Sequence, residues 1–140
     1  MSQSQSVARA FSTLRARVEG EVRTDQFSRI LYSTDASIYQ VEPDGVVVPR
    51  HERDLVEIVK AASQHKVPII PRAGGTSLAG QCVGKGIVVD ISKYMNQLVE
   101  VNPSEQWAWV QPGSFKMNSH DRSKHTTSCT DLTHPPPTEL

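Results

Sequence analysis

The sequence predicts an α+β fold that contains a strand–helix–strand (βαβ) unit and a β-hairpin. Short apolar runs at residues 46–48 and 67–70 flank a segment with helical periodicity, which is typical of a βαβ unit. Two further segments, 98–101 and 107–110, flank a polar turn sequence at 102–105, which indicates a hairpin. These patterns place one parallel unit and one antiparallel unit in the same chain.

The first 29 residues are expected to form a helical segment. Four apolar residues recur at spacings of three and four and therefore lie on one helical face: Val7, Phe11, Leu14 and Val18. This stretch carries arginines but lacks the continuous apolar core of a secretory signal. An organellar presequence is the alternative, and we favour an amphipathic helix that opens the folded part. Residues 25–40 are expected to be irregular apart from one helical turn.

Residues 46–48 are expected to form the first strand of the βαβ unit. They make a continuous apolar run, which is typical of a strand that is covered on both faces. The apolar period then changes, and a helix with one apolar face is expected from Asp54 to about His65. A second strand is expected at 67–70 and a third at 87–91.

Charge and cysteine content exclude several classes of protein. Fifteen Lys and Arg balance fifteen Asp and Glu, so the chain lacks the basic excess typical of a nucleic-acid binder. No apolar run in the sequence approaches the length of a transmembrane helix. The two cysteines are too few for a disulfide framework, so the expected location is the reducing cytoplasm.

The most informative stretch, residues 71–86, directly follows the second predicted strand. It holds five of the eight glycines. Glycines allow positive φ and close approach of a ligand, so consecutive N–H groups can form an anion-binding nest there. Thr76 and Ser77 add hydroxyl groups and Arg72 adds positive charge, a combination that suits a pyrophosphate. From the spacing alone, a tight turn that binds nothing is an equal alternative.

This stretch matches neither of the two common nucleotide-binding fingerprints. A Walker A loop would need Gly-Lys-Ser or Gly-Lys-Thr, which the sequence lacks. No Gly-x-Gly-x-x-Gly opens a helix here, as the Rossmann fingerprint would require. A nucleoside triphosphatase and an ordinary nicotinamide dehydrogenase are therefore disfavoured.

Several separated segments, in the same order, resemble the FAD-linked oxidases. The segments are 32–39, 48–50, 67–81, 89–96 and 110–113. This is the flavin domain shared with vanillyl-alcohol oxidase and p-cresol methylhydroxylase, and the D-lactate and glycolate dehydrogenases are the branch that the chain resembles most. The resemblance covers residues 14–113. It implies that residues 30–113 form the N-terminal, incomplete part of a p-cresol methylhydroxylase-type FAD-binding domain.

The resemblance implies that FAD, a small-molecule cofactor, binds without a covalent bond. The backbone of residues 73–77 would cradle its pyrophosphate. Ala73 replaces the family's common glycine, which requires a negative φ there. Thr76 stands where covalently flavinylated relatives often carry histidine, so no covalent attachment is expected. The implied cofactor-binding residues are Pro71, Arg72, Ala73, Gly74, Gly75, Thr76, Ser77, Leu78, Gly80 and Gln81.

By resemblance, the chain is expected to be the N-terminal fragment of an FAD-dependent oxidoreductase that oxidises a 2-hydroxy acid such as D-lactate or glycolate. No catalytic residue is assigned, so the chain alone is expected to be inactive. One alternative is a non-catalytic module that binds FAD or a nucleotide, or that pairs with a partner chain supplying the missing half. Another is a nonfunctional truncated product, because half a domain would leave an apolar sheet face uncovered.

The resemblance ends at Gly113, and residues 114–140 are expected to be unstructured. Read one nucleotide out of step, the codons permitted for residues 113–138 allow a segment similar to the family's next helix and FAD-contacting stretch. A frameshift or a mispredicted gene boundary is therefore favoured over a native tail. No metal site is predicted, because the spacing of the tail's candidate zinc ligands matches no familiar zinc module. These ligands are His120, His125, Cys129 and His134.

Four residues near the end of the matched region have open roles. Asp90 and Tyr94 either contact the flavin or make structural hydrogen bonds. Trp107 and Trp109 alternate on a predicted strand and therefore lie on one face of it. We expect this pair to pack in the core or against a sheet rather than to stack on a ligand.

Overall fold

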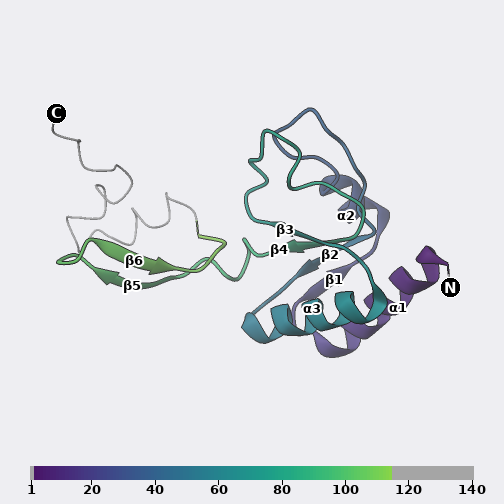
Figure 1. The fold of residues 1–140 in the computed structure, drawn as a ribbon, viewed down its shortest axis with the longest axis horizontal. Coiled ribbons are helices and arrows are strands. Elements are labelled where there is room, and N and C mark those ends of the chain that lie inside the picture. Colours follow the sequence, from purple (N-terminus) through teal and green to yellow (C-terminus); the bar gives the residue numbers. More distant parts are fainter. Residues whose placement is uncertain (1, 115–140) are drawn as a thin grey trace.

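The computed structural model describes residues 2–114, and Figure 1 shows how their helices and strands are arranged. None of the described helices is both long enough and apolar enough to cross a membrane. Residues 115–140 of the predicted tail lie outside the described residues, and so do all four candidate zinc ligands. The elements in chain order are α1 (Gln3–Arg17), β1 (Glu21–Arg23), α2 (Gln26–Leu31), β2 (Gly45–Val48), α3 (Glu52–His65), β3 (Ile69–Arg72), β4 (Ile87–Asp90), β5 (Leu98–Asn102) and β6 (Trp107–Val110).

The first four strands form one mixed sheet in the order β1-β2-β4-β3. β4 is parallel to both β2 and β3, whereas β1 is antiparallel to β2. The predicted βαβ unit is present, but its two strands are not neighbours, because β4 lies between them. Because β3 and β4 are adjacent and parallel, the connection must run from the carboxyl end of β3 back to the amino end of β4. That connection is the glycine-rich stretch.

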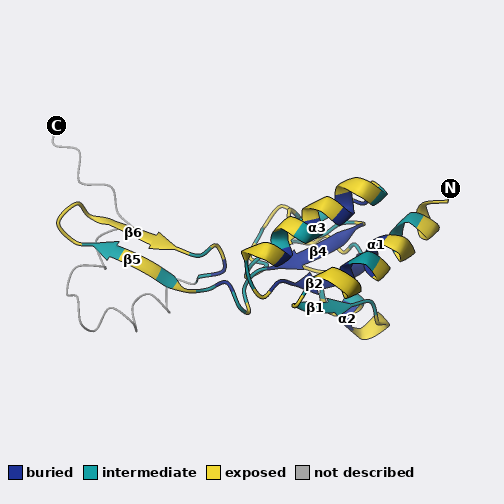
Figure 2. Cartoon of the chain, turned by 90° about the horizontal axis from the view of Figure 1, so that it is seen from below, coloured by how far each residue is buried: buried dark blue, intermediate teal, exposed yellow. Residues whose placement is uncertain are grey.

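Helices α1 and α3 cover one face of the sheet, as Figures 1 and 2 show. Their apolar faces pack together on the inward side chains of β2 and β4. Burial of each large aliphatic side chain of this kind stabilises a fold by about 1.5–3 kcal/mol. The buried members of this core are Ala10, Phe11, Leu14, Val47, Ile58, Ala61, Ala62, Val67, Ile87 and Val89.

The opposite face of the sheet is also covered. The side chains of Val46, Val48 and Val88 are almost wholly buried there, beneath Tyr32, Ile70 and Tyr94, which complete a second apolar cluster. β2 and β4 are consequently buried along their whole length. The expectation of an uncovered apolar sheet face is therefore wrong for the part of the chain that the structure describes.

β3, predicted at residues 67–70, begins two residues later than the sequence predicts. Val67 is buried, and its N–H donates to Ala62 O at 3.0 Å, so it closes helix α3 rather than opening β3. Lys66, with φ 55°, makes the left-handed turn that ends the helix. The shift brings Pro71 into β3, which is tolerated because β3 is an edge strand and one side of it needs no N–H.

Residues 21–31 are more regular than the sequence predicts. β1 pairs with β2 from Glu21 to Arg23, and α2 follows almost at once. The side chain of Asp25 accepts a hydrogen bond from Ser28 N at 2.8 Å and thereby caps α2. Only this short helix, the expected single helical turn, was indicated by the sequence.

The predicted hairpin is confirmed, and its two strands project away from the four-stranded sheet (Figure 1). Every residue of β6 is exposed. Trp107 and Trp109 are 37% and 65% exposed. The expectation that these two rings pack in a core or against a sheet is wrong for the described part of the chain, because no element of it lies over the hairpin.

Candidate functional site

Residues 73–86 form the connection from β3 to β4, referred to below as the glycine loop. It leaves the carboxyl end of β3, the edge at which ligands bind in parallel sheets. Gly75 and Gly80 have φ values of 66° and 74°, in the left-handed region that side chains disfavour. Ala73 keeps a negative φ, so its departure from glycine leaves the backbone unstrained.

The first half of the glycine loop presents a row of free hydrogen-bond donors. Among residues 2–114, no acceptor takes a hydrogen bond from any of the five backbone N–H groups of Gly74, Gly75, Thr76, Ser77 and Leu78. This half of the loop is solvent-accessible, and the Leu78 side chain is 82% exposed. Successive free N–H groups in a turn can form a concavity that favours an anion.

The hydroxyl group of Ser77 is used within the loop. Its oxygen accepts hydrogen bonds from Ala79 N at 3.2 Å and Gln81 N at 3.1 Å, and it lies 2.8 Å from Gln81 Oε1. These bonds close residues 77–81 into a compact turn. Ser77 thus shapes the loop, whereas Thr76 is exposed beside it.

Arg72 braces the glycine loop against the chain that follows α2. Its Nη1 donates to Thr34 O at 2.7 Å, and its guanidinium carbon lies 5.3 Å from the centre of the Tyr32 ring. A side chain at Gly75 would place its Cβ 2.5 Å from Nη2 of Arg72. The positive charge expected from the sequence is therefore held close under the loop.

Residues 34–39, referred to below as the Asp35 segment, lie beside the glycine loop (Figure 1). Asp35 accepts hydrogen bonds from Ser37 N at 2.9 Å, Ser37 Oγ at 2.5 Å and Cys82 N at 3.3 Å. Ala36 N donates to Gly75 O at 3.1 Å. Sequence reasoning assigned no role to Asp35, although its Asp-x-Ser spacing is typical of a side chain that turns the backbone.

The ten predicted site residues occupy one continuous stretch in the structure. Pro71 and Arg72 end β3, and the other eight form the first part of the glycine loop. Cys82 is half-buried on the returning limb of the loop, where its N–H contacts Asp35.

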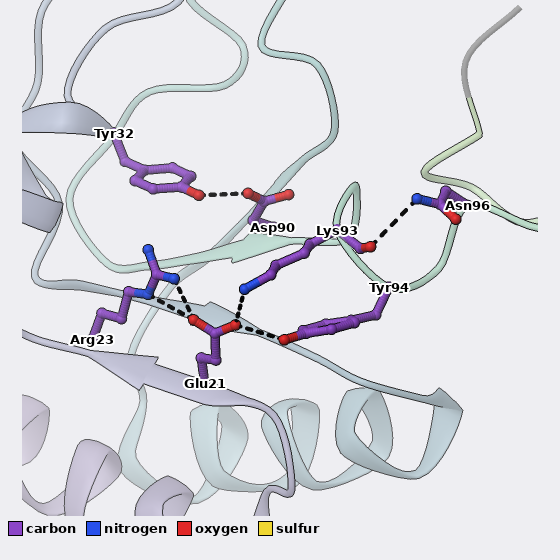
Figure 3. Close-up of polar contacts among 7 residues, drawn as sticks. All are labelled: Glu21, Arg23, Tyr32, Asp90, Lys93, Tyr94 and Asn96. Carbon is purple, nitrogen blue, oxygen red and sulfur yellow. Dashed lines mark hydrogen bonds and ion pairs between the residues drawn. The ribbon is translucent and has the colours of Figure 1, made fainter. Parts of the chain in front are cut away.

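A polar cluster fastens the sheet face near the carboxyl end of β4, as Figure 3 shows. Glu21 accepts hydrogen bonds from Lys93, Arg23 and Tyr94, the last at 2.8 Å from the Tyr94 hydroxyl. These contacts, with that from Lys93 the strongest, lower the pKa of Glu21 to about 2.

Asp90 and Tyr32 form a second polar contact on the same face (Figure 3). The Tyr32 hydroxyl donates to Asp90 Oδ2 at 2.5 Å, and burial together with this bond raises the pKa of Tyr32 to about 12. Asp90 also accepts from Ser92 N at 2.8 Å and from Ser92 Oγ at 2.6 Å. Asp90 and Tyr94 thus make structural hydrogen bonds.

The low pKa of Glu21 predicts an acid-sensitive contribution to stability. An ionised Glu21 is favoured in the folded state, so its contribution is complete above pH 4.5 and is lost as the pH falls toward about 2. The stability advantage of the wild type over Glu21→Gln should therefore be greatest near neutral pH and should shrink across this interval. Urea unfolding of both proteins at a series of pH values tests this, and an advantage that does not vary with pH would contradict it.

The family of the chain follows from sequence comparison. Residues 43–117 match the family described as FAD binding domain, a range that includes β2, α3 and the whole glycine loop. The chain belongs to this family. The predicted resemblance to the FAD-linked oxidases is confirmed.

Curated relatives of this FAD binding domain protein include much longer proteins. The D-2-hydroxyglutarate dehydrogenase of Escherichia coli (strain K12) is 42% identical over 100 residues, which cover 69% of this chain and 10% of that protein. The glycolate oxidase subunit GlcD of Bacillus subtilis (strain 168) is 42% identical over 92 residues, 64% of this chain and 20% of that protein. The chain thus spans about a tenth of the length of the dehydrogenase.

Solved structures confirm the predicted type of fold. The 4-ethylphenol oxidase from Gulosibacter chungangensis superposes with a TM-score of 0.74 at 20% identity, covering 89% of this chain and 25% of the oxidase. p-Cresol methylhydroxylase gives a TM-score of 0.72 at 18% identity, with the same coverage of 89% and 25%. The fold is therefore that of a p-cresol methylhydroxylase-type FAD-binding domain, of which the chain forms a part.

Proposed function

We propose that residues 71–81 bind the pyrophosphate of FAD without a covalent bond. The observation that carries this proposal is the row of five N–H groups, Gly74–Leu78, which have no acceptor among the described residues. A pyrophosphate is an anion with several acceptor oxygens, and it suits such a row of N–H dipoles. The positive charge of Arg72, close beneath Gly75, favours the same ligand.

The residues present suit the cofactor in their backbone conformation as well as in their charge. Gly75 adopts a positive φ, which glycine takes up without strain, and the guanidinium of Arg72 fills the space where a side chain would stand. Pro71 and Arg72 would hold the start of the loop, and the turn closed by Ser77 and Gln81 would hold its far wall. When bound, FAD supplies the group that accepts a hydride, while the protein binds and orients it.

We propose further that the chain contributes this FAD-binding part to an oxidoreductase of 2-hydroxy acids. The support lies in the relatives, which include D-2-hydroxyglutarate dehydrogenases, a glycolate oxidase subunit and D-lactate dehydrogenases. Each of those names refers to a small acid with a hydroxyl on the carbon next to the carboxylate. Residues 30–113 would form the binding unit, with D-lactate or glycolate as the substrate class and no catalytic residue assigned to this chain.

Titration with FAD tests the proposal. The chain is expected to quench flavin fluorescence on binding, and acid precipitation is expected to leave all of the flavin in the supernatant. Gly75→Val should weaken binding by about tenfold or more, because the left-handed region costs an L-residue about 1–2 kcal/mol and a β-branched one more.

Gly75→Asn is the matched control for this titration. It adds the same Cβ beside Arg72, yet asparagine tolerates a positive φ, so its loss of affinity should be the smaller one. Circular dichroism checks that both variants keep the fold. A wild-type chain that does not bind FAD, or a folded Gly75→Val that binds it as tightly as wild type, would overturn the proposal.

A further inference from the structure

We infer that Asp35 is a positioning residue for the proposed FAD site. Its carboxylate joins the Asp35 segment to the returning limb of the glycine loop, and this junction helps to hold the part of the loop that carries the free N–H groups at 74–78. The inference rests on the proposed function of the loop. Asp35 itself lies outside the residues that would touch the pyrophosphate.

The two oxygens of the Asp35 carboxylate serve two different parts of the chain. Oδ1 accepts hydrogen bonds from the backbone N–H and the hydroxyl of Ser37, at 2.9 and 2.5 Å. Oδ2 accepts the N–H of Cys82 at 3.3 Å, across 47 positions of sequence. The bonds from Ser37, with that of its hydroxyl the strongest, lower the pKa of Asp35, so the carboxylate is ionised at neutral pH. One oxygen therefore shapes the Asp35 segment while the other holds the loop.

The Asp35 segment contacts the beginning and the middle of the glycine loop as well as its return. Arg72 Nη1 donates to Thr34 O at 2.7 Å at the start of the loop. Ala36 N donates to Gly75 O at 3.1 Å in the middle. With the Cys82 contact, the segment holds the loop at three separated points.

The contact from Ala36 orients a donor of the proposed site. A trans peptide unit is planar, and its C=O and the following N–H point in opposite directions. Because Gly75 O points at Ala36 N, the N–H of Thr76 must point away from the Asp35 segment. The segment therefore fixes the direction in which at least this N–H group is presented to a ligand.

A second connection runs from Asp35 through Ser37 to the far wall of the loop. Ser37 Oγ, which donates to Asp35, also accepts the N–H of Tyr39 at 3.1 Å. The Tyr39 ring lies directly against Gly80, where a side-chain Cβ would stand 2.7 Å from Cδ2 of the ring. Release of Asp35 would therefore loosen both the return at Cys82 and the support of Gly80.

Asp35→Asn is the sharpest test because it preserves shape and removes one acceptor. The three hydrogen atoms that converge on Asp35 need oxygens on both sides, and an amide offers oxygen on one side only. FAD affinity, the melting temperature and the NMR signals of the loop amides at 74–82 are measured for each protein. We expect Asp35→Asn to raise the Kd for FAD about tenfold and to shift the loop amide signals.

Asp25→Ala is the control for a loss of stability away from the loop, because asparagine would cap the helix as well as aspartate does. Asp25 also accepts a backbone N–H, that of Ser28 at 2.8 Å, but it caps α2 and makes no contact with the glycine loop among the described residues. Replacement by alanine removes the cap and should lower the melting temperature, while it leaves the Kd and the loop signals unchanged. A merely structural role for Asp35 would give the same pattern for both variants.

The outcomes separate this inference from the proposed function. If wild type binds FAD and Asp35→Asn binds it equally well with unshifted loop signals, the positioning role is overturned and the proposed function stands. If wild type does not bind FAD, the proposed function fails and the role of Asp35 in that site fails with it. A raised Kd with shifted loop signals in Asp35→Asn, both absent in Asp25→Ala, supports the positioning role and the proposed function.

Discussion

Replacement of Asp54 by alanine is expected to lower the free energy of unfolding by about 3–5 kcal/mol, since each hydrogen bond to a charged group contributes about 1.5 kcal/mol or more. Asp54 is 1% exposed and accepts three backbone hydrogen bonds. These come from Glu19 N at 3.0 Å, Gly20 N at 2.9 Å and Arg50 N at 2.8 Å. The carboxylate thus ties the turn before β1 to the chain that enters α3, and alanine would leave all three groups unpaired.

Urea unfolding followed by circular dichroism measures this effect. Glu52→Ala is the matched control, because Glu52 is an exposed acid in the same first turn of α3 and its loss should change stability by no more than about 0.5 kcal/mol. The stability of Asp54→Asn should lie between those of Asp54→Ala and Glu52→Ala, since its amide keeps one acceptor oxygen. Equal midpoints for Asp54→Ala and Glu52→Ala would show that the three hydrogen bonds do not stabilise the fold.

Gly86→Ala is expected to destabilise the fold by about 3–5 kcal/mol, from forced backbone strain and overpacking together. Gly86 has φ 138° and stands buried at the entry to β4. A Cβ there would lie 2.4 Å from Pro68 O, a backbone atom that also accepts the N–H of Ile87 at 2.9 Å. The clash can be relieved only by moving β3 away from β4.

Gly84→Ala provides the comparison for this variant. Gly84 lies two residues earlier with no positive φ, and its Cβ would meet only the flexible side chain of Ile70, at 3.3 Å from Cγ1. The melting temperature of Gly84→Ala should therefore stay close to that of wild type. Equal melting temperatures for Gly86→Ala and Gly84→Ala would contradict the prediction and would mean that β3 can move away from β4 at little energetic cost.

The elements predicted correctly from the sequence are those with a clear periodicity of apolar residues within their own segment. β2 is a continuous apolar run and α3 has one apolar face, so each is readable locally. β1 has one apolar residue, Val22, and depends on pairing with β2 and on the contacts of Glu21 to Lys93 and Tyr94. The strand order was not readable, because the apolar runs of β2, β3 and β4 are alike.

In the candidate site, too, local sequence features were predictable and contacts between distant residues were not. The glycine-rich stretch is visible in the sequence because its residue types are unusual and contiguous. The role of Asp35 was not visible, because its partner Cys82 lies 47 positions away. Arg72 was expected to supply charge, and its contact with Thr34, set by the path of a distant segment, shows that it also supports the loop.

The central position of β4 has a consequence for synthesis on the ribosome. The chain emerges from its N-terminus, so β1, β2, α3 and β3 all leave the exit tunnel before Ile87–Asp90. β2 can pair with β1 at once, but β3 has no neighbouring strand until β4 inserts between β2 and β3. The contact between Asp35 and Cys82 lies on the limb of the loop that leads into β4, so we expect a nascent chain to complete the edge proposed to bind FAD in the same late step that completes its sheet.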